Sequence, residues 1–163
     1  MAKNKEEKTN VMRVLEQKKI AYTPHSYPHE EGVAVDGVTV AKSMGFDPAI
    51  VFKTLVARGA SKQYYVFDVP VAENLDLKKA AKAVGEKSIE MIHQKELLPL
   101  TGYIHGGCSP VGMKKLFPTV FHSSAENLAA MIVSAGKIGY QVELAPHDLA
   151  ALVRAKFADI IVE

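Results

Sequence analysis

The chain has 163 residues, a net charge of +2 and a hydrophobic fraction of 48%, which together indicate one folded domain over residues 1–163. Its one cysteine, Cys108, excludes an internal disulfide and a zinc site of four cysteines. No apolar run reaches the roughly 18 residues of a membrane-spanning helix, and the charged segment 1–10 lacks the apolar stretch of a secretory signal. A cytoplasmic protein without a membrane partner is therefore expected.

The first half of the chain has the pattern of short helices and strands joined by turns. Thr9 or Asn10 is expected to cap the first helix, and Gly45 is a helix stop signal. The turn 59–62 separates two apolar runs, which is typical of a hairpin. The predicted elements are a helix over 6–20, a strand over 21–27, a loop over 28–37, a helix over 38–45, and strands over 50–58 and 63–71.

Capping signals also mark the helices of the second half. Asp76 and Gly85 bracket an amphipathic helix, Pro99 is expected to stop the next one, and Pro146 lies near the start of the last. The predicted elements are helices over 76–85, 93–102 and 146–155, and strands over 87–92, 117–122, 130–136 and 140–145. This irregular alternation favours a mixed α/β fold, with helices packed on a mixed β-sheet, over a doubly wound parallel sheet.

Two histidines, His25 and His29, have a spacing that would place both on one face of a helix. The neighbouring prolines Pro24 and Pro28 make a helix there improbable, and no third ligand stands nearby. The sequence therefore predicts two exposed loop histidines, no metal site and no cofactor.

The segment TGYIHGGCSPVG, residues 101–112, contains four glycines. It matches neither a Walker motif nor a dinucleotide-binding fingerprint. Two interpretations stay open: a sharp turn between strands, or a loop whose backbone N–H groups face a carbonyl or oxyanion. His105 and Cys108 could form a base and a nucleophile, but no flanking signature supports the pair, and the cysteine is expected to be a small apolar filler.

Lys53 stands inside the apolar strand IVFKTLVA. Because strand side chains alternate between faces, Lys53 shares its face with Val51 and Leu55, and lysine is rarely buried without a partner. An edge strand whose lysine reaches water would explain the pattern. A cation that projects into a pocket and holds a phosphate or carbonyl explains it equally well.

Further lysines gather along one helix and after the glycine-rich segment. Each lysine taken alone is typical of an ordinary solvated surface, whereas the group together is typical of a patch that binds along a phosphate backbone. These residues are Lys78, Lys79, Lys82, Lys87, Lys114 and Lys115.

Five segments stand in an order and spacing typical of a known family: 51–57, 74–85, 101–112, 132–149 and 155–160. Through them nearly the whole chain resembles the YbaK/EbsC family, which belongs to the superfamily of the editing domain of bacterial prolyl-tRNA synthetase. The resemblance implies a twisted mixed β-sheet, partly curled into a barrel and surrounded by helices. It also implies hydrolysis of mischarged aminoacyl-tRNA in trans, chiefly Cys-tRNA(Pro), without a metal or a protein nucleophile.

The resemblance also assigns the site residues. It implies catalytic roles for Lys53, Gly106 and Ser134, and substrate binding by Tyr27, Thr54, Gly107, Pro110, Gly112, Lys137 and Gln141. Gln141 departs from the family pattern, because many relatives carry an acid there, which puts a carboxylate role in doubt. Lysine 53 would face the terminal adenosine and its phosphate or ester, and the glycine-rich loop would line the acyl pocket.

Three functional hypotheses follow from the resemblance. The first is a deacylase that takes the acceptor ends of tRNA(Pro) and, as a second substrate, tRNA(Cys), with prolyl-tRNA synthetase as a candidate partner. The second is a module that binds tRNA ends or a synthetase without hydrolysis. The third keeps the enzyme but changes the acyl group, for example to alanine, because one methylene changes specificity only by about 1–3 kcal/mol.

Overall fold

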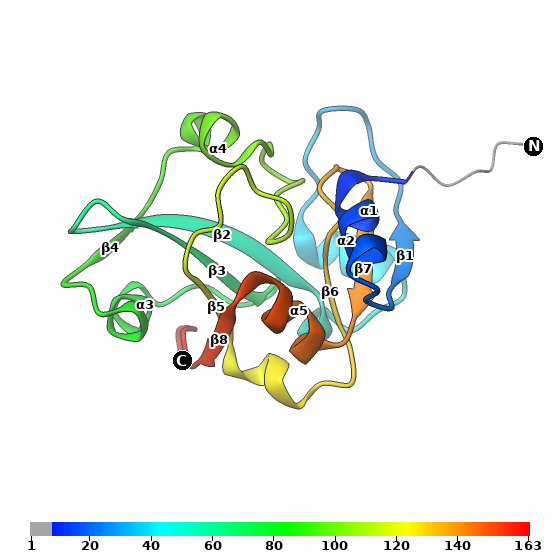
Figure 1. Cartoon of the computed structure of the whole chain (residues 1–163). Coiled ribbons are helices and arrows are strands. Elements are labelled where there is room, and N and C mark those ends of the chain that lie inside the picture. Colours follow the sequence, from blue (N-terminus) through cyan, green and yellow to red (C-terminus); the bar gives the residue numbers. More distant parts are fainter. Residues whose placement is uncertain (1–7) are drawn as a thin grey trace, which may run out of the picture.

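The computed structural model describes residues 8–163, in which helices surround two β-sheets (Figure 1). The first helix begins after Thr9, whose hydroxyl accepts a hydrogen bond from the Met12 N–H at 3.2 Å. Thr9 is therefore the cap, and the predicted start at residues 6 and 7 lies outside the described residues. The helices are α1 (Asn10–Gln17), α2 (Gly37–Ser43), α3 (Leu77–Val84), α4 (Gln94–Thr101) and α5 (Pro146–Val153), with 3₁₀ turns at Pro48–Ile50 and Ser123–Asn127.

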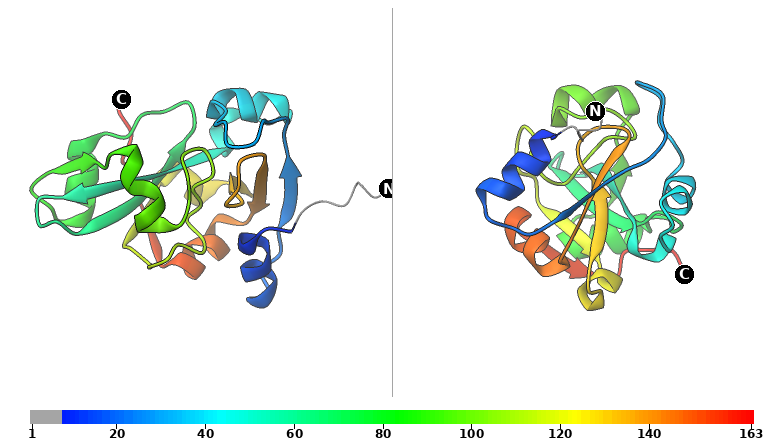
Figure 2. Two further views of the ribbon diagram at one scale, coloured as in Figure 1. Left: turned by 90° about the horizontal axis from the view of Figure 1, so that it is seen from above. Right: turned by 90° about the vertical axis from the view of Figure 1, so that its right-hand side faces the viewer.

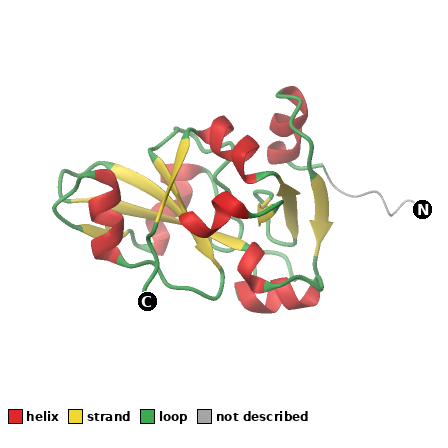
Figure 3. Ribbon diagram, turned by 90° about the horizontal axis from the view of Figure 1, so that it is seen from below, coloured by secondary structure: helices red, strands yellow, loops and turns green. Residues whose placement is uncertain are grey.

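The strands form one sheet of five and one sheet of three. The larger sheet has the order β4-β2-β3-β5-β8 and the smaller one the order β1-β7-β6. Figures 2 and 3 show the smaller sheet at one end of the molecule and the tip of the β2–β3 hairpin at the other. The strands are β1 (Thr23–Ser26), β2 (Phe52–Gly59), β3 (Tyr64–Pro70), β4 (Ile89–Met91), β5 (Thr119–His122), β6 (Met131–Ser134), β7 (Tyr140–Leu144) and β8 (Ala155–Ala158).

The larger sheet is mixed, as the sequence predicts. Strands β2, β3 and β4 pair antiparallel, whereas β5 runs parallel to both β3 and β8. A bridge between Val51 and Ile132 joins the two sheets. The mixed α/β class is confirmed, and the two sheets are not closed into a barrel.

The core divides according to these layers. One cluster lies between the sheets, where Phe52 and Phe121 of the larger sheet meet Met131 and Val142 of the smaller one beneath α1 and α5. Two further clusters cover opposite faces of the larger sheet, one under α3 and one under α4 and the glycine-rich loop (Figure 1). A fourth, small cluster joins Ala41 of α2 to Val51 and Ile132. Because the first cluster contains residues of both sheets, it fixes the position of one sheet relative to the other.

Several predicted boundaries differ from the structure by a few residues, and two of them are wrong for a clear local reason. The last helix ends at Val153 because Arg154 takes a left-handed φ of 59°, and residue 155 begins the unpredicted strand β8. Pro99 lies inside α4 and does not end it. The helix closes instead at Gly102, whose φ is 90° and whose N–H donates to the Leu98 carbonyl at 2.8 Å.

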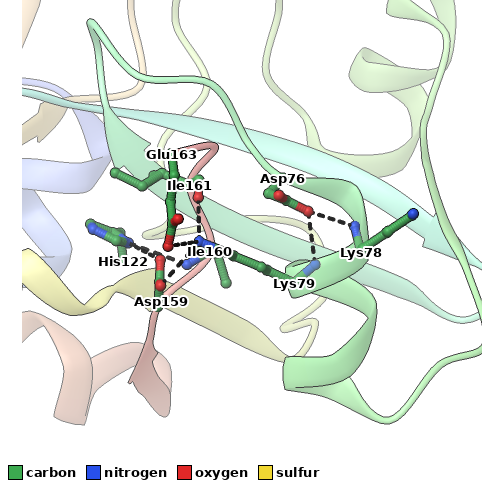
Figure 4. Close-up of polar contacts among 8 residues, drawn as sticks. All are labelled: Asp76, Lys78, Lys79, His122, Asp159, Ile160, Ile161 and Glu163. Carbon is green, nitrogen blue, oxygen red and sulfur yellow. Dashed lines mark hydrogen bonds and ion pairs between the residues drawn. The ribbon is translucent and has the colours of Figure 1, made fainter.

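Lys79 anchors the end of the chain through its polar contacts (Figure 4). Its ammonium group donates to Asp159 at 3.1 Å, to the Ile161 carbonyl at 2.9 Å and to Glu163 at 3.3 Å. Asp76 caps the same helix by accepting two backbone N–H groups, as predicted. Lys79 is thus engaged within the fold, which removes it from the candidate phosphate patch. No helix among residues 8–163 is long and apolar enough to cross a membrane.

Candidate functional site

A cavity of about 360 Å³ opens between the two sheets, a size typical of small-molecule sites. Its wall combines the start of β2, the end of β6, the start of β7, the segment that leads into α2, and the glycine-rich loop. The lining residues are Tyr27, Ala34, Val35, Asp36, Gly37, Val40, Phe52, Lys53, Thr54, Leu55, Val71, Leu97, His105, Gly106, Cys108, Ser134 and Gln141.

The start of strand β2 borders the cavity because the two edges of the strand are paired over different lengths. One edge pairs with β3 along its length, while the other pairs with β4 only from Ala57 to Gly59. The first residues of β2 therefore border the cavity. Lys53 is half-buried there, and burial lowers the pKa of its ammonium group, against smaller opposing effects of the Asp36 and Glu73 carboxylates. Lys53 is thus a cation inside the cavity, which favours the functional interpretation over an ordinary edge lysine.

Thr54, the next residue, lies on the other face of the strand, opposite Asp68 of β3. Its hydroxyl donates to Asp68 Oδ1 at 2.5 Å, while Asp68 Oδ2 has no hydrogen-bond partner among the described residues. Asp68 is fully buried, and this burial raises the pKa of its carboxyl group to about 7, although the Thr54 hydrogen bond opposes the shift. The sequence analysis did not identify Asp68, although the presence of an acid within the apolar strand 63–71 could have indicated it.

The smaller sheet brings Ser134 and Gln141 to the opposite wall. They are direct partners in the β6–β7 ladder, and both are buried. The Ser134 hydroxyl oxygen accepts the Gly136 N–H at 3.1 Å, which leaves its proton available to a ligand. Gln141 Oε1 is buried without a hydrogen-bond partner among residues 8–163. Buried polar groups are nearly always paired in folded proteins, so this oxygen is a candidate acceptor for a ligand donor.

Tyr27 completes this wall just after β1. Its N–H donates to the Gly139 carbonyl at 2.9 Å, which fixes the segment against the β6–β7 turn. The side chain is buried, and burial raises the pKa of the phenol group, against a smaller effect of the Gly139 backbone. Tyr27 therefore presents a neutral hydroxyl group at the cavity.

The glycine-rich loop reaches the cavity through Gly106. This residue has a φ of 90°, and a Cβ atom there would lie 2.7 Å from the Ala34 Cβ, so only glycine fits without strain. Gly107 lies outside the lining and donates its N–H to the Ile104 carbonyl at 2.9 Å. The N–H group of Gly107 is therefore already used in a hydrogen bond within the loop.

The structure brings together six of the ten residues that the sequence assigns to the site. Gly107, Pro110, Gly112 and Lys137 lie outside the cavity lining. Pro110 is a buried residue of the loop, and exposed Lys137 holds its ammonium 5.8 Å from the centre of the Tyr140 ring. The six that line it are Lys53, Gly106, Ser134, Tyr27, Thr54 and Gln141.

His25 does not lie in an exposed loop as predicted. It is half-buried in β1, and its Nε2 lies 2.7 Å from a carboxylate oxygen of Glu143 on β7. His29, four residues on, packs its ring over Gly139. Within residues 8–163 no group of three histidine, cysteine, aspartate or glutamate side chains is placed to hold a metal ion.

The raised pKa of Asp68 predicts a pH-dependent stability. The unfolded chain releases the Asp68 proton near its ordinary pKa of about 4, whereas the folded protein keeps it up to about 7. The wild type therefore loses stability as pH rises through this window. Asp68→Asn should remove this loss, so that its free energy of unfolding gains about 3 kcal/mol relative to wild type between about pH 5 and pH 8. Urea unfolding at several pH values measures this gain, and a pH-independent difference would contradict it.

Comparison with known proteins confirms the resemblance seen in the sequence. The model of the aminoacyl-tRNA editing domain family matches residues 32–152. An Enterococcus faecalis protein named "Putative Cys-tRNA(Pro)/Cys-tRNA(Cys) deacylase EbsC" is 47% identical over 161 residues, which cover 98% of each chain.

Solved structures share the fold at lower identity. The structure described as "a putative trans-editing enzyme for prolyl tRNA synthetase" is 24% identical, with a TM-score of 0.79 over 94% of this chain and 95% of its own. The structure of the hypothetical protein APE2540 is 18% identical, with a TM-score of 0.82 over 93% and 99%. The family match spans most of the chain and the E. faecalis relative nearly all of it. The chain therefore belongs to the aminoacyl-tRNA editing domain family.

Proposed function

We propose that this protein hydrolyses mischarged aminoacyl-tRNA in trans, chiefly Cys-tRNA(Pro), with Cys-tRNA(Cys) as a second substrate. The observation that carries the proposal is the cavity in which Lys53, Gly106 and Ser134 meet, from three separate elements. The printed name of the E. faecalis relative supports the choice of the cysteinyl esters. The wall contains the Lys53 cation, the Asp36 carboxylate, several neutral donors and an acceptor, Gln141 Oε1, without a partner among residues 8–163, which suits a polar ester better than an apolar ligand.

The protein would act by positioning and by electrostatic stabilisation. The substrate's own thiolate attacks the carbonyl carbon of its ester, so that a C–S bond forms and the C–O bond to the ribose breaks. The ribose oxygen takes up a proton, and the cysteine thiolactone that leaves is then hydrolysed by water. Lys53 and the backbone of Gly106 would stabilise charge on the ester oxygens, and the Ser134 hydroxyl group would donate a hydrogen bond to them.

The tRNA acceptor end would enter with its terminal adenosine beside Lys53. Lys53 carries the positive charge of the cavity wall, which suits the phosphate next to that adenosine. The net charge of +2 provides little general attraction to RNA. Prolyl-tRNA synthetase is therefore the proposed partner that would supply tRNA specificity.

A deacylation assay on tRNA(Pro) and tRNA(Cys), charged with cysteine, serine, alanine and proline, tests this function. The proposal expects fast release of cysteine and slow release of proline. Faster release of alanine than of cysteine would indicate that the substrate carries another small acyl group. Binding of charged tRNA without any release would instead support a module that only binds tRNA ends, and would overturn the enzymatic proposal.

Cys108 is not expected to be the nucleophile. It is buried, and burial together with the Asp68 charge raises the pKa of its thiol to about 12, so that the thiolate is scarce near neutral pH. Cys108→Ala should retain kcat/KM within about threefold, while Ser109→Ala, a buried neighbour, controls for packing. Loss of several orders of magnitude in a folded Cys108→Ala variant would restore the nucleophile hypothesis.

A further inference from the structure

Asp68 is a buried carboxyl group behind the cavity wall, and the mechanism above does not use it. Thr54 and Asp68 are direct partners in the β2–β3 ladder, so their side chains lie on the same face of the sheet. The Thr54 hydroxyl donates to Asp68 Oδ1 at 2.5 Å, and Thr54 also lines the cavity. The pair therefore connects a buried acid to the surface that a ligand touches.

This hydrogen bond decides what Thr54 can offer a ligand. A hydroxyl group has one proton and two lone pairs, and an ionised carboxylate accepts only. While Asp68 is ionised, the Thr54 proton is committed to it, and the Thr54 oxygen presents lone pairs to the cavity. A protonated Asp68 can donate to Thr54 instead, which frees the Thr54 proton to point toward the ligand.

The charged groups around Asp68 are few. On its own face, the glycine-rich loop contributes Cys108, whose thiol is neutral, and on β5 the register partner is Phe121. Lys53 pairs with Val69 and so points to the opposite face. Burial, not a neighbouring charge, dominates the raised pKa of about 7. Both protonation states are therefore populated near neutral pH.

We propose, building on the deacylase function above, that Asp68 is a positioning residue that holds Thr54 as a hydrogen-bond acceptor for the α-ammonium group of the bound aminoacyl ester. A carboxylate behind a hydroxyl group polarises its oxygen toward a cation. Gln141 lines the opposite wall, and its Oε1, which has no partner among residues 8–163, would be a second acceptor for the same group. The α-ammonium group is the cationic donor that every aminoacyl ester carries.

A double-mutant cycle tests whether Asp68 acts through Thr54. The variants are Asp68→Asn, Thr54→Val and their combination, with Asp148→Asn as the control because Asp148 is exposed at the start of α5. Ionisation of the substrate thiol gives every variant a rise in kcat/KM for Cys-tRNA(Pro) toward about pH 8.5. In the wild type we expect an additional step through about pH 7, from Asp68. Each single variant should lack this additional step, and above pH 7 its kcat/KM should be about 10- to 100-fold below that of the wild type. The double variant should be no slower than Thr54→Val, and Asp148→Asn should keep the wild-type profile.

Additive losses in the cycle, or an Asp68→Asn variant with the wild-type pH profile, would overturn the proposal. If Asp68→Asn does not fold, Thr54→Val decides alone, because a retained pH step in that variant contradicts the mechanism. The identity of the donor is tested with cysteine joined by an amide to 3′-amino-3′-deoxyadenosine, compared with its analogue that lacks the α-amino group. Wild type should prefer the amine by about tenfold or more, and Thr54→Val should not. Equal preference in both proteins would overturn the assignment.

One readout does not depend on turnover. Because the Thr54 hydrogen bond lowers the Asp68 pKa, Thr54→Val should raise it, which ¹³C NMR titration of the carboxyl group measures. A wild-type protein that hydrolyses no charged tRNA would end the deacylase proposal, whereas an unchanged Asp68 pKa in Thr54→Val would end the positioning role.

Discussion

Lys53→Met should lower kcat/KM for Cys-tRNA(Pro) by about 10²- to 10³-fold, the loss typical of removing one preorganised group that stabilises transition-state charge. Methionine keeps most of the length and apolar stem of lysine, so the variant removes the charge and leaves the packing of β2 in place. The lowered pKa of Lys53 adds a second expectation. The wild-type rate should decline on the alkaline side at a lower pH than an ordinary lysine would give, and the variant should lack this decline.

Two further variants separate charge from position. Lys53→Arg keeps a cation but changes its shape, and should recover only part of the loss because the planar guanidinium needs more room in the cavity. Lys156→Met removes an exposed lysine on β8 and should leave the rate unchanged. A folded Lys53→Met variant with the wild-type rate would show that the cation of the cavity takes no part in the reaction.

The fold was most predictable where a local signal fixes the backbone. Asp76 and Gly85 bound α3 because one side chain caps the first N–H groups and the other takes the left-handed conformation. Strand β8 carried no such signal. Its four residues pair with β5 across a long sequence separation, and the polar Lys156 interrupts their apolar pattern. Pairing of this kind depends on tertiary packing, which a local pattern does not record.

The site was predictable only in part, for a related reason. Lys53 was identifiable because a charged residue is unusual inside an apolar strand. Asp68 is unusual in the same way, but the importance of that acid depends on its register with Thr54. Gly107 and Pro110 were assigned from their motif, yet the loop turns so that only Gly106 of its motif glycines lines the cavity. A motif gives residue types, whereas the direction of each group depends on the fold.

Cys-tRNA(Pro) should be deacylated more than about 200-fold faster than Ser-tRNA(Pro), a ratio above what one methylene contributes in a pocket. The two acyl groups differ by sulfur against oxygen, so a wall that sorts by size would separate them little. A thiol with a pKa of about 8.5 is a few per cent thiolate at pH 7 and is a strong nucleophile, whereas a hydroxyl group is weak without a base. The measurement is the ratio of kcat/KM for both esters on the same tRNA.

Trapping of the product distinguishes the routes further. Attack by the substrate thiol releases cysteine thiolactone first, and free cysteine appears only after its hydrolysis. S-methylcysteinyl-tRNA(Pro) is the matched control, because its sulfur cannot attack in the same way and its ester should be as slow as the seryl one. Comparable rates for all three esters, with free amino acid and no thiolactone, would indicate attack by water. Ser134, Tyr27 and His105 line the cavity and would then be the groups placed to activate that water.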